Sequence, residues 1–561
     1  MPKPSWAFKI LTILTFLHLS FLSQSQAAPT CQEADRVALI GFKARIFKDT
    51  TGIMSSWVGK DCCSGNWEGI QCDPSTGRVT GVILQGPPDN NAIYMKGAIS
   101  PTLSDLKFLK LVVISGMKKL SGAIPSFTGL IYLTQIVLDD NSLNGNIPSS
   151  LGQLRSLQTL SLSGNDLIGP IPQSLGNLRN LLQINLARNS LTGTLNFPNL
   201  GTNLEYLDVS YNMLSGTIPT VLGRQSKMTL LDLSNNRFTG QIPDSLCNLR
   251  SLVDLSLSNN LLTGQVPARI GQLKSLSTLS LSFNQLVGQI PESISQLQNL
   301  WQLNLSRNGF SGRLSDTVFS KGLPSLQSID LSYNKFNFGS VPKWITSRQL
   351  SDVRLAGCNL KGGLPIFTRP SSLTSIDLSD NRFTGGVSGF LRKMSSVQKI
   401  KISNNQLREN LSAIALPNGV GLLDLHSNQL YGSLSVLGSK GTFLEYVDLS
   451  NNQISGNIPS TVSNLGNLAR FDISRNRITG TIPPSLGKLS KLGWLDISSN
   501  SIGGKIPTSL LVIKYLRHVN FRGNKLCGEI PQGRPLNVFP EAAYAHNLCL
   551  CGKPLSPCKQ G

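Results

Sequence analysis

Apolar residues recur along most of this chain in a pattern that repeats about every 24 positions. The copy from Leu444 to Asn467 reads LEYVDLSNNQISGNIPSTVSNLGN, and the next copy, from Leu468, reads LARFDISRNRITGTIPPSLGKLSK. Each copy begins with L-x-x-L-x-L-x-x-N, whose alternating apolar positions predict one short strand with one buried face. The second half contains G-x-I-P. Because glycine permits a turn and proline stops a helix, it predicts a compact return segment.

The recurring asparagine defines the register of the array. Its position occurs 17 times between Asn141 and Asn524, once occupied by Cys358, and two irregular copies precede Asn141. A buried asparagine at this bend can satisfy backbone groups that a strand end leaves unpaired. Units that pack only on their neighbours form an elongated array. The sequence therefore predicts an α/β repeat solenoid of about 19 repeats, with a concave parallel β-sheet, over residues 79–531.

The two ends of the chain differ from the array. Residues 1–27 predict a secretory signal peptide, since Lys3 and Lys9 accompany an apolar run that is too short to span a bilayer comfortably. Residues 28–78 are predicted to form an N-terminal cap, in which Val37, Ile40 and Phe47 recur at helical spacing. Residues 532–561 are predicted to form a C-terminal cap.

Ten cysteines fit an oxidising destination, and their placement is informative. Cys247 and Cys358 lie inside the array, several repeats apart, and are predicted to be buried free thiols. The other eight cysteines bracket the array at its ends, where a solenoid must cover its exposed core: Cys31, Cys62, Cys63, Cys72, Cys527, Cys549, Cys551 and Cys558. Spacing alone leaves their connectivity open.

The motif L-x-G-x-I-P-x-x-L-G-x-L recurs, for example as RFTGQIPDSLCNL, and resembles the plant extracellular class of leucine-rich repeat. The end segments KDCCSGNWEGIQCDPSTGRVTGVILQG, from Lys60, and LCLCGKPLSPC, from Leu548, resemble those of polygalacturonase-inhibiting proteins. They resemble still more those of the plant proteins named for DNA-damage repair and toleration, and the chain is also similar to the ectodomains of plant receptor-like proteins. These resemblances imply a leucine-rich repeat superhelix with disulfide-bonded caps, paired Cys31–Cys62, Cys63–Cys72, Cys527–Cys549 and Cys551–Cys558.

Candidate catalytic chemistry is sparse. After removal of the signal peptide only His426, His518 and His546 remain, and none stands in a metal-ligand pattern such as H-E-x-x-H. We therefore predict no enzyme activity, no catalytic residues, no metal and no cofactor.

Recognition is the better-supported class of function. Aromatic residues on faces expected to be polar favour interfaces, because they bury much area with few rotamers to freeze. Residues 343–408 carry eleven Lys and Arg, which predicts either a docking surface for an anionic partner or a solvated flank. The repeat consensus LDLS also places an Asp on many strands, so that the repeat itself explains the acidic positions better than a specific partner does. The predicted ligand-binding residues of the concave face are Tyr206, Asp208, Asp232, Trp301, Arg354, Lys399, Lys401, Asp424, Tyr446, Asp448, Asp472, Trp494 and Asp496.

Two N-glycosylation sequons are predicted, at Asn304 and Asn410. A glycan at Asn304 would shield the concave strand beside Trp301. Together with the pair Tyr446 and Trp494, this moves the expected contact surface toward the C-terminal third.

These features predict a secreted recognition protein in the plant apoplast, the cell wall or at the cell surface. It would bind a protein, peptide or cell-wall glycan ligand and act with receptor kinases in defence or developmental signalling. The formal net charge of +21 suits a cell wall, but the secretory signal argues against nucleic acid as a partner. No apolar segment predicts a membrane span or a GPI-type tail, so membrane association is expected only through partners. The alternatives are an inhibitor of secreted polygalacturonases and a structural protein bound to the cell wall by its charge.

Overall fold

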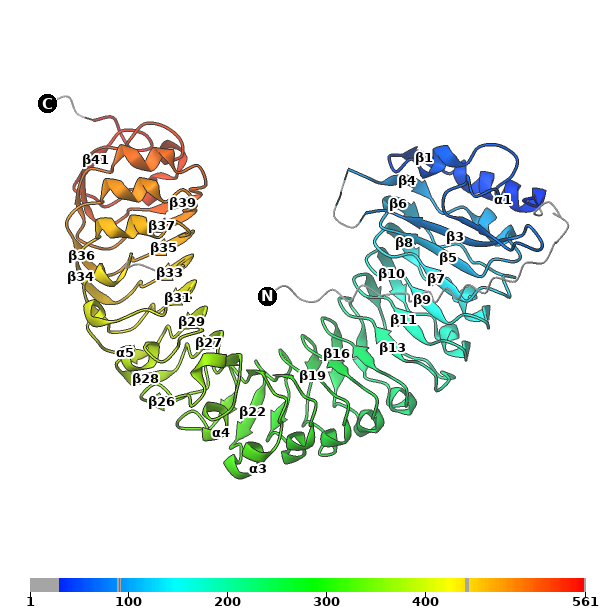
Figure 1. Ribbon diagram of the computed structural model, residues 1–561, viewed down its shortest axis with the longest axis horizontal. Coiled ribbons are helices and arrows are strands. Elements are labelled where there is room, and N and C mark those ends of the chain that lie inside the picture. The colour runs from blue at the N-terminus through cyan, green and yellow to red at the C-terminus, as the bar shows by residue number, and fades with distance from the viewer. Residues whose placement is uncertain (1–29, 88–89, 91, 439–442, 559–561) are drawn as a thin grey trace, which may run out of the picture.

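The computed structural model describes residues 30–87, 90, 92–438 and 443–558. The predicted signal peptide, residues 1–27, lies outside these residues. The described chain forms a curved solenoid, with its two caps at the tips of an arc and one long sheet along the inner side (Figure 1). The predicted α/β repeat solenoid with a concave parallel sheet is confirmed.

The concave sheet is built from one short strand per repeat, joined in parallel to the strand of the next repeat. At its N-terminal edge β2 (Ile70–Cys72) pairs antiparallel with β3. The parallel strands in the described chain are β3 (Val79–Gln85), β5 (Leu111–Ser115), β7 (Gln135–Val137), β9 (Thr159–Ser161), β11 (Gln183–Asn185), β13 (Tyr206–Asp208), β15 (Leu230–Asp232), β17 (Asp254–Ser256), β19 (Thr278–Ser280), β21 (Gln302–Asn304), β23 (Ser328–Asp330), β25 (Asp352–Arg354), β27 (Ser375–Asp377), β29 (Lys399–Lys401), β31 (Leu422–Asp424), β33 (Tyr446–Asp448), β35 (Arg470–Asp472), β37 (Trp494–Asp496) and β39 (His518–Asn520).

A second, interrupted sheet follows the bend of each repeat along one flank. Its strands are β1 (Ile46–Asp49), β4 (Met95–Ala98), β6 (Lys118–Gly122), β8 (Ser142–Asn146), β10 (Asp166–Pro170), β12 (Ser190–Thr192), β14 (Ser215–Thr217), β16 (Arg237–Gly240), β18 (Leu261–Leu262), β20 (Val287–Gly288), β22 (Gly309–Gly312), β24 (Lys335–Phe336), β26 (Lys361–Gly362), β28 (Arg382–Gly385), β30 (Gln406–Leu407), β32 (Tyr431–Gly432), β34 (Gln453–Asn457), β36 (Arg477–Thr479), β38 (Gly503–Gly504), β40 (Lys525–Glu529) and β41 (Cys549–Cys551).

Short helices form the convex side and the caps. Several 3₁₀ helices of the repeats begin directly after the proline of the I-P motif, because a fixed φ suits a helix start and the missing N–H is not needed there. The α-helices are α1 (Glu33–Lys43), α2 (Ile53–Ser56), α3 (Asp316–Lys321), α4 (Lys343–Thr346) and α5 (Ser388–Leu391). The 3₁₀ helices are η1 (Pro101–Asp105), η2 (Ser149–Gln153), η3 (Gln173–Asn177), η4 (Thr220–Arg224), η5 (Asp244–Asn248), η6 (Ile270–Gln272), η7 (Glu292–Gln296), η8 (Pro370–Ser372), η9 (Leu411–Ala413), η10 (Leu434–Val436), η11 (Ser460–Asn464), η12 (Pro484–Lys488), η13 (Thr508–Val512), η14 (Leu536–Val538) and η15 (Glu541–Ala543).

A ladder of buried asparagines joins successive repeats. The Nδ2 of Asn452 donates to the carbonyls of Leu425, Leu449 and Ser450, each at 3.1 Å, and its Oδ1 accepts from the Leu430 N–H at 3.0 Å. One side chain thus satisfies backbone groups of two repeats, which is why this position tolerates little variation in chemistry. Asn547, in the C-terminal cap, makes the same pattern of bonds and extends the ladder by one step beyond Asn524.

Each cap closes one end of the solenoid with two disulfides. They are Cys31–Cys62, Cys63–Cys72, Cys527–Cys549 and Cys551–Cys558, the pairing that the family resemblance implies. Cys247 and Cys358 are buried free thiols, as predicted. Within the N-terminal cap, the Asp35 carboxylate is fully buried and bonds both the Arg78 guanidinium and the Val79 N–H.

The helix of the N-terminal cap differs from the prediction. It ends at Lys43, and the chain then forms β1 from Ile46. Its buried side consists of Asp35, Ala38, Leu39 and Phe42, whereas Val37, Ile40 and Phe47 are exposed. The spacing of the latter three fits a helix, but the opposite side faces inward, because it buries Leu39 and Phe42 and carries the Asp35 carboxylate that pairs with Arg78.

Candidate ligand-binding surface

Strand register aligns the outward residues of the concave sheet into columns. The first residues of β33, β35, β37 and β39 form one column, and the third residues of β31 to β37 form the column beside it. We call Tyr446, Arg470, Trp494 and His518 the C-terminal ladder. Asp424, Asp448, Asp472 and Asp496 form the aspartate column. Side chains that are 24 residues apart along the chain therefore become direct neighbours in space.

The C-terminal ladder is a continuous stack. The Arg470 guanidinium carbon lies 5.2 Å from the ring centroid of Tyr446 and 4.3 Å from that of Trp494. The Trp494 and His518 rings follow, stacked with their centroids 3.5 Å apart. Cation–π and stacking contacts hold these four groups half-buried across four strands. In the described chain the Arg470 Nε, the Trp494 Nε1 and the His518 Nε2 are shielded from solvent without a hydrogen-bond partner, so the ladder presents unsatisfied donors or acceptors.

Carboxylates of the aspartate column accept hydrogen bonds from the bends that follow the strands. Oδ1 of Asp448 accepts from the N–H and Oγ of Ser450, and Oδ1 of Asp472 does the same with Ser474. This local bond explains the recurring D-x-S of the repeat. Three of the four aspartates are buried rather than exposed to solvent: Asp424, Asp448 and Asp472.

Burial changes the titration of this surface. Desolvation raises the pKa of Asp472 to about 6, and the charges of Asp448 and Asp496 act in the same direction. The Arg470 Nη2 lies 3.7 Å from Asp472 Oδ2 and 3.9 Å from Asp448 Oδ2, so one cation faces both carboxylates. Burial also lowers the pKa of His518.

Asp424 forms an ion pair at the N-terminal end of the aspartate column. Its Oδ1 lies 2.6 Å from His426 Nδ1, and this bond raises the pKa of the imidazole. Ligand atoms of Asp424, His426 and Asp448 lie within 4.8 Å of one another. The Asp424 carboxylate already bonds His426, and the Asp448 carboxylate already bonds Ser450, so these ligand atoms are engaged in contacts within the protein.

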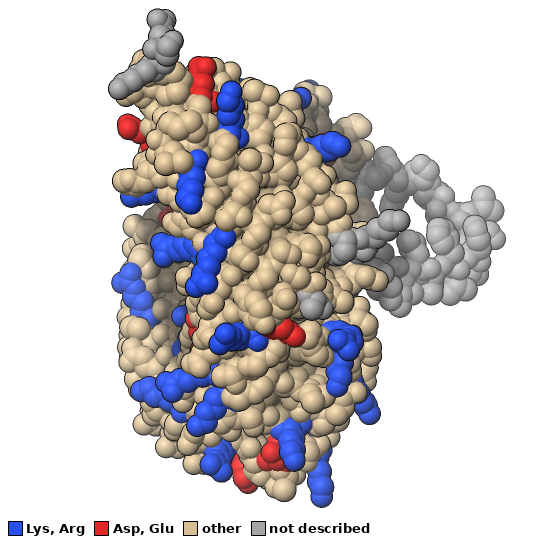
Figure 2. Space-filling view, turned by 90° about the vertical axis from the view of Figure 1, so that its left-hand side faces the viewer, with Lys and Arg blue, Asp and Glu red and all other residues tan. Residues whose placement is uncertain are grey.

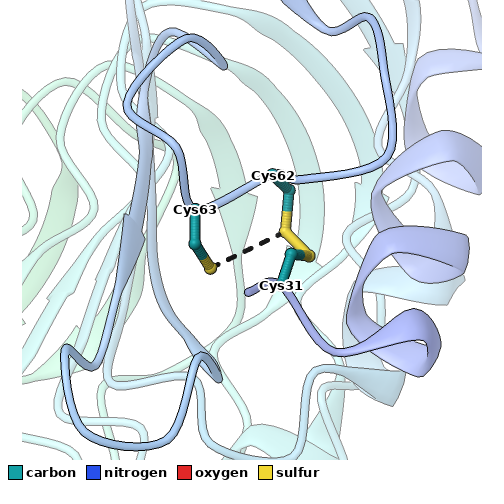
Figure 3. Close-up of side chains that lie close together, drawn as sticks. All are labelled: Cys31, Cys62 and Cys63. Carbon is teal, nitrogen blue, oxygen red and sulfur yellow. Dashed lines mark hydrogen bonds between the residues drawn. A yellow bond between two sulfur atoms is a disulfide. The ribbon is translucent and has the colours of Figure 1, made fainter. Parts of the chain in front are cut away.

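A second cluster of potential metal ligands lies in the N-terminal cap. Figure 3 shows Cys31, Cys62 and Cys63 close together, with 3.9 Å between the sulfurs of Cys62 and Cys63. All three belong to disulfides, Cys63 through Cys72, so their sulfurs serve the cap rather than a metal.

The remaining predicted binding residues lie elsewhere on the concave face. Tyr206 and Asp208 on β13 adjoin Asp232 on β15, and burial raises the pKa of all three. Trp301 precedes β21 and is 45% exposed. On β25 the guanidinium of Arg354 pairs with Asp352 at 3.1 Å, and on β29 Lys399 and Lys401 are exposed. The structure thus brings the predicted residues together in two separate groups, one on β13 and β15 and a larger one toward the C-terminus, where Lys401 is the register neighbour of Asp424.

The basic tract, residues 343–408, does not form one surface. Arg354, Lys399 and Lys401 face the concave side from their strands, while α4 carries Lys343 on the convex side. Arg348 has a structural role, because its guanidinium donates to the carbonyls of Phe319, Gly322 and Leu323. A tract of this length winds around both sides of a solenoid, since each repeat passes through both.

Two groups of contacts were missed by the sequence reasoning. Arg470 joins Tyr446 to Trp494, although the aromatic residue of its own repeat, Phe471, is buried and gives no sign of this stack. At the rim, residues that precede the ladder asparagines stack in the same way: Arg307 lies over the rings of Phe283 and Tyr333, at 5.0 and 4.2 Å. The Tyr333 ring passes over Gly357, and its hydroxyl donates to Asp380 at 2.5 Å. Glycine is needed at position 357, because a Cβ there would lie 2.5 Å from the ring. Aromatic residues directly before the ladder asparagine were the available signal.

The sequons occupy different settings. The Asn304 Oδ1 on β21 accepts from the N–H and Oγ of Ser306 and is half-buried. Asn410 is exposed at the start of η9. Glycosylation at either site stays a prediction.

A concave parallel sheet, a flanking second sheet and a ladder of asparagines define a leucine-rich repeat solenoid. Family models match accordingly: a leucine-rich repeat region over residues 185–380, leucine-rich repeats over residues 156–178, 372–394 and 442–502, and a leucine-rich repeat N-terminal domain over residues 32–73. The chain is a leucine-rich repeat protein of the plant extracellular type.

Similar curated proteins include a DNA damage-repair/toleration protein from Arabidopsis thaliana, 32% identical over 137 residues, which are 23% of this chain and 37% of that protein. The receptor-like protein EIX2 from Solanum lycopersicum is 34% identical over 126 residues, 21% of this chain and 12% of the relative. The matched segments therefore span only part of these relatives, 37% of the first and 12% of the second.

Similar solved structures include those of plant receptor kinases. That of GASSHO1/SCHENGEN3 from Arabidopsis thaliana, in complex with CASPARIAN STRIP INTEGRITY FACTOR 2, has a TM-score of 0.77 at 31% identity, covering 89% of this chain and 59% of that one. The Arabidopsis receptor kinase HAESA, in complex with the peptide hormone IDA and the co-receptor SERK1, has a TM-score of 0.60 at 28% identity, covering 93% and 99%. Among the described residues of this chain, no helix has the length and apolarity needed to cross a membrane.

Proposed function

We propose that this protein is an extracellular recognition protein whose concave face binds a peptide or protein ligand. The observation that carries the proposal is the C-terminal ladder, in which Tyr446, Arg470 and Trp494 form one half-buried surface beside four aspartates. Aromatic and arginine side chains in such surroundings contribute most to binding at interfaces. The four disulfides support an oxidising, extracellular destination, to which residues 1–27 would direct the chain.

The proposed partners are receptor kinases, and the proposed role is in defence or developmental signalling. Support comes from HAESA, whose solved complex contains both a peptide hormone and a co-receptor. A solenoid of this length offers a concave face for a ligand and leaves its flanks and caps for a second protein. The expected readout is ligand-dependent binding of this chain to the ectodomain of a receptor kinase.

The charges beside the ladder indicate the kind of ligand. Asp448 and Asp472 share one arginine, Arg470, and Asp496 adjoins Asp472 on the next strand, so carboxylates outnumber cations here. A ligand with a Lys, an Arg or a free amino group would therefore meet an opposite charge. Because the pKa of Asp472 is about 6, the column gains negative charge as the pH rises through 6. A basic ligand should therefore bind more tightly at pH 7 than at pH 5.

A displayed library of random peptides, selected on the purified chain, tests this proposal. Peptides selected on the wild type should be enriched in basic residues and should lose at least about tenfold in affinity with Trp494→Ala or Arg470→Ala. Tyr211→Ala removes a similarly large exposed aromatic side chain at the rim, far from the ladder, and serves as the matched control. Equal losses for Tyr211→Ala and Trp494→Ala would reject the ladder as the binding site.

A second candidate is a structural role in the cell wall. It is favoured by the outer flank of the C-terminal half, where Lys and Arg side chains far outnumber Asp and Glu (Figure 2). Exposed charge contacts are screened by salt, so a protein held in this way should elute from isolated walls as the salt concentration rises. Retention that is independent of salt would speak against this role.

A further inference from the structure

Two repeats of the described N-terminal half lack a convex helix, one between β6 and β7 and one between β12 and β13, and the second of these forms an irregular loop. Between η3 and η4 the chain passes through residues 195–201, LNFPNLG, as a turn at Pro198 and Asn199 without helical structure. Neighbouring repeats place the proline directly after the isoleucine, at the start of the helix, as Pro172 does before η3. Here the proline stands two residues later, where its ring and its missing N–H prevent a helix from continuing.

A buried glutamine compensates for the missing helix. Gln225 follows η4 at a place where neighbouring repeats have Leu178 and Leu249, and it is fully buried. Its Nε2 donates to the Gly201 carbonyl at 2.6 Å, and its Oε1 accepts from the Leu204 N–H at 3.1 Å. A polar side chain is stable in this core only because it satisfies backbone groups that the helix would have used. The irregular loop is therefore held in place by the next repeat.

The loop leaves a hollow of about 980 Å³ at the convex side, which we call the convex hollow. Arg155, Arg179 and Arg224 line it, and no Asp or Glu does. Arg155 and Arg179 occupy the same place in consecutive repeats, and Arg224 ends η4. Within the described chain none of the three guanidinium groups takes part in an ion pair. Three like charges thus face one concavity without a counter-charge from the protein.

Side-chain amides complete the lining. Asn199 donates to Asn177 Oδ1 at 3.1 Å, and Asn180 donates to the Arg155 carbonyl at 3.0 Å. Gln153 adds a fourth carboxamide to the wall. The hollow therefore offers guanidinium forks, which suit carboxylates and sulfates in bidentate geometry, together with amides that can bond hydroxyl groups.

We propose that the convex hollow binds an acidic oligosaccharide, with its anionic groups on Arg155, Arg179 and Arg224 and its hydroxyl groups on the amides. A single inorganic anion would fill little of this volume, which lies at the upper end of the range for ligand sites. The sparse apolar lining disfavours a lipid or an aromatic ligand. This site is on the opposite side of the solenoid from the C-terminal ladder and stands independently of the proposed peptide ligand.

The test is a binding titration of the full chain with four probes: an oligogalacturonate, its neutral methyl ester, a sulfated oligosaccharide of similar length, and inorganic phosphate. The triple variant R155A/R179A/R224A should bind the acidic oligosaccharide about tenfold or more weakly, since each exposed pair contributes a modest amount. The carboxylated and sulfated probes distinguish uronates from sulfate esters, and tighter binding of either one supports an acidic-sugar site.

The matched control is R250A/R269A/K274A, which removes the same charge from exposed convex positions beside complete helices η5 and η6. It should change affinity less than about twofold. Asn199→Trp keeps all three arginines but occupies the hollow, and it should weaken binding as the triple variant does. Thermal unfolding of each variant checks that the fold is retained.

Four results would overturn the proposal. Equal losses of affinity in the two triple variants would mean that net charge alone explains binding. Wild-type affinity in Asn199→Trp would mean that the ligand does not occupy the hollow. Equal binding of the methyl ester would exclude recognition of anionic groups. Displacement of the oligosaccharide by phosphate at similar concentration would leave a simple anion site in place of a saccharide site.

Discussion

The asparagine ladder allows a sharp prediction for Asn452→Ala. The substitution removes the acceptor for the Leu430 N–H and the Nδ2 group that bonds the carbonyls of Leu425, Leu449 and Ser450. The two Nδ2 hydrogens and the one acceptor amount to three full hydrogen bonds at about 1 kcal/mol each, so the expected loss of stability is about 3 kcal/mol. Asn452 is only 9% exposed, and water replaces these bonds poorly.

The assay combines urea unfolding with amide hydrogen exchange, because a solenoid can open locally without unfolding as a whole. Faster exchange should appear in peptides covering residues 425–452. The matched control is Gln429→Ala, which lies in the same segment, is exposed and forms no side-chain hydrogen bond in the described chain. It should change stability by less than about 0.5 kcal/mol. If the two variants exchange alike, the ladder bonds contribute nothing beyond what water supplies, and the reasoning is wrong.

Three further predictions follow from buried groups. Cys358→Asn places an asparagine at the position between Asn141 and Asn524 where the ladder has a cysteine. It should raise the free energy of unfolding by about 1 kcal/mol, measured by urea unfolding under reducing conditions. A lower free energy of unfolding would mean that the local backbone is adapted to the cysteine side chain. Asp35→Ala breaks the buried pair with Arg78 and should cost about 3 kcal/mol, seen as early unfolding of the N-terminal cap, while Glu33→Ala in the exposed pair with Arg36 should leave the melting curve unchanged. Because burial raises the pKa of Asp472 to about 6, this carboxyl destabilises the fold when it is charged. The stability of the wild type relative to Asp472→Asn should therefore rise as the pH falls from 7 toward 4, by about 1–3 kcal/mol in urea unfolding, and a difference that does not change with pH would contradict the assignment.

The sequence by itself determined the repeat and its chemistry. Period, strand position and the buried asparagine follow from spacing, because each repeat solves the same local problem: one apolar face to bury and one bend to satisfy. Leu444, Val447, Leu449 and Ile458 are buried as their positions in the repeat require. The clustered cysteines and the family resemblance were sufficient for the disulfide pairing.

Only the tertiary structure decided which side chains meet. Tyr446 and Trp494 were expected on one surface, but the stack depends on Arg470 between them and His518 beyond, contacts that exist only once the parallel register places residues 24 apart side by side. The convex hollow likewise requires knowing that a displaced proline removes one helix while Gln225 holds the loop. Such features arise from differences between neighbouring repeats, and their physical effect lies in the space between repeats, which a linear pattern does not contain.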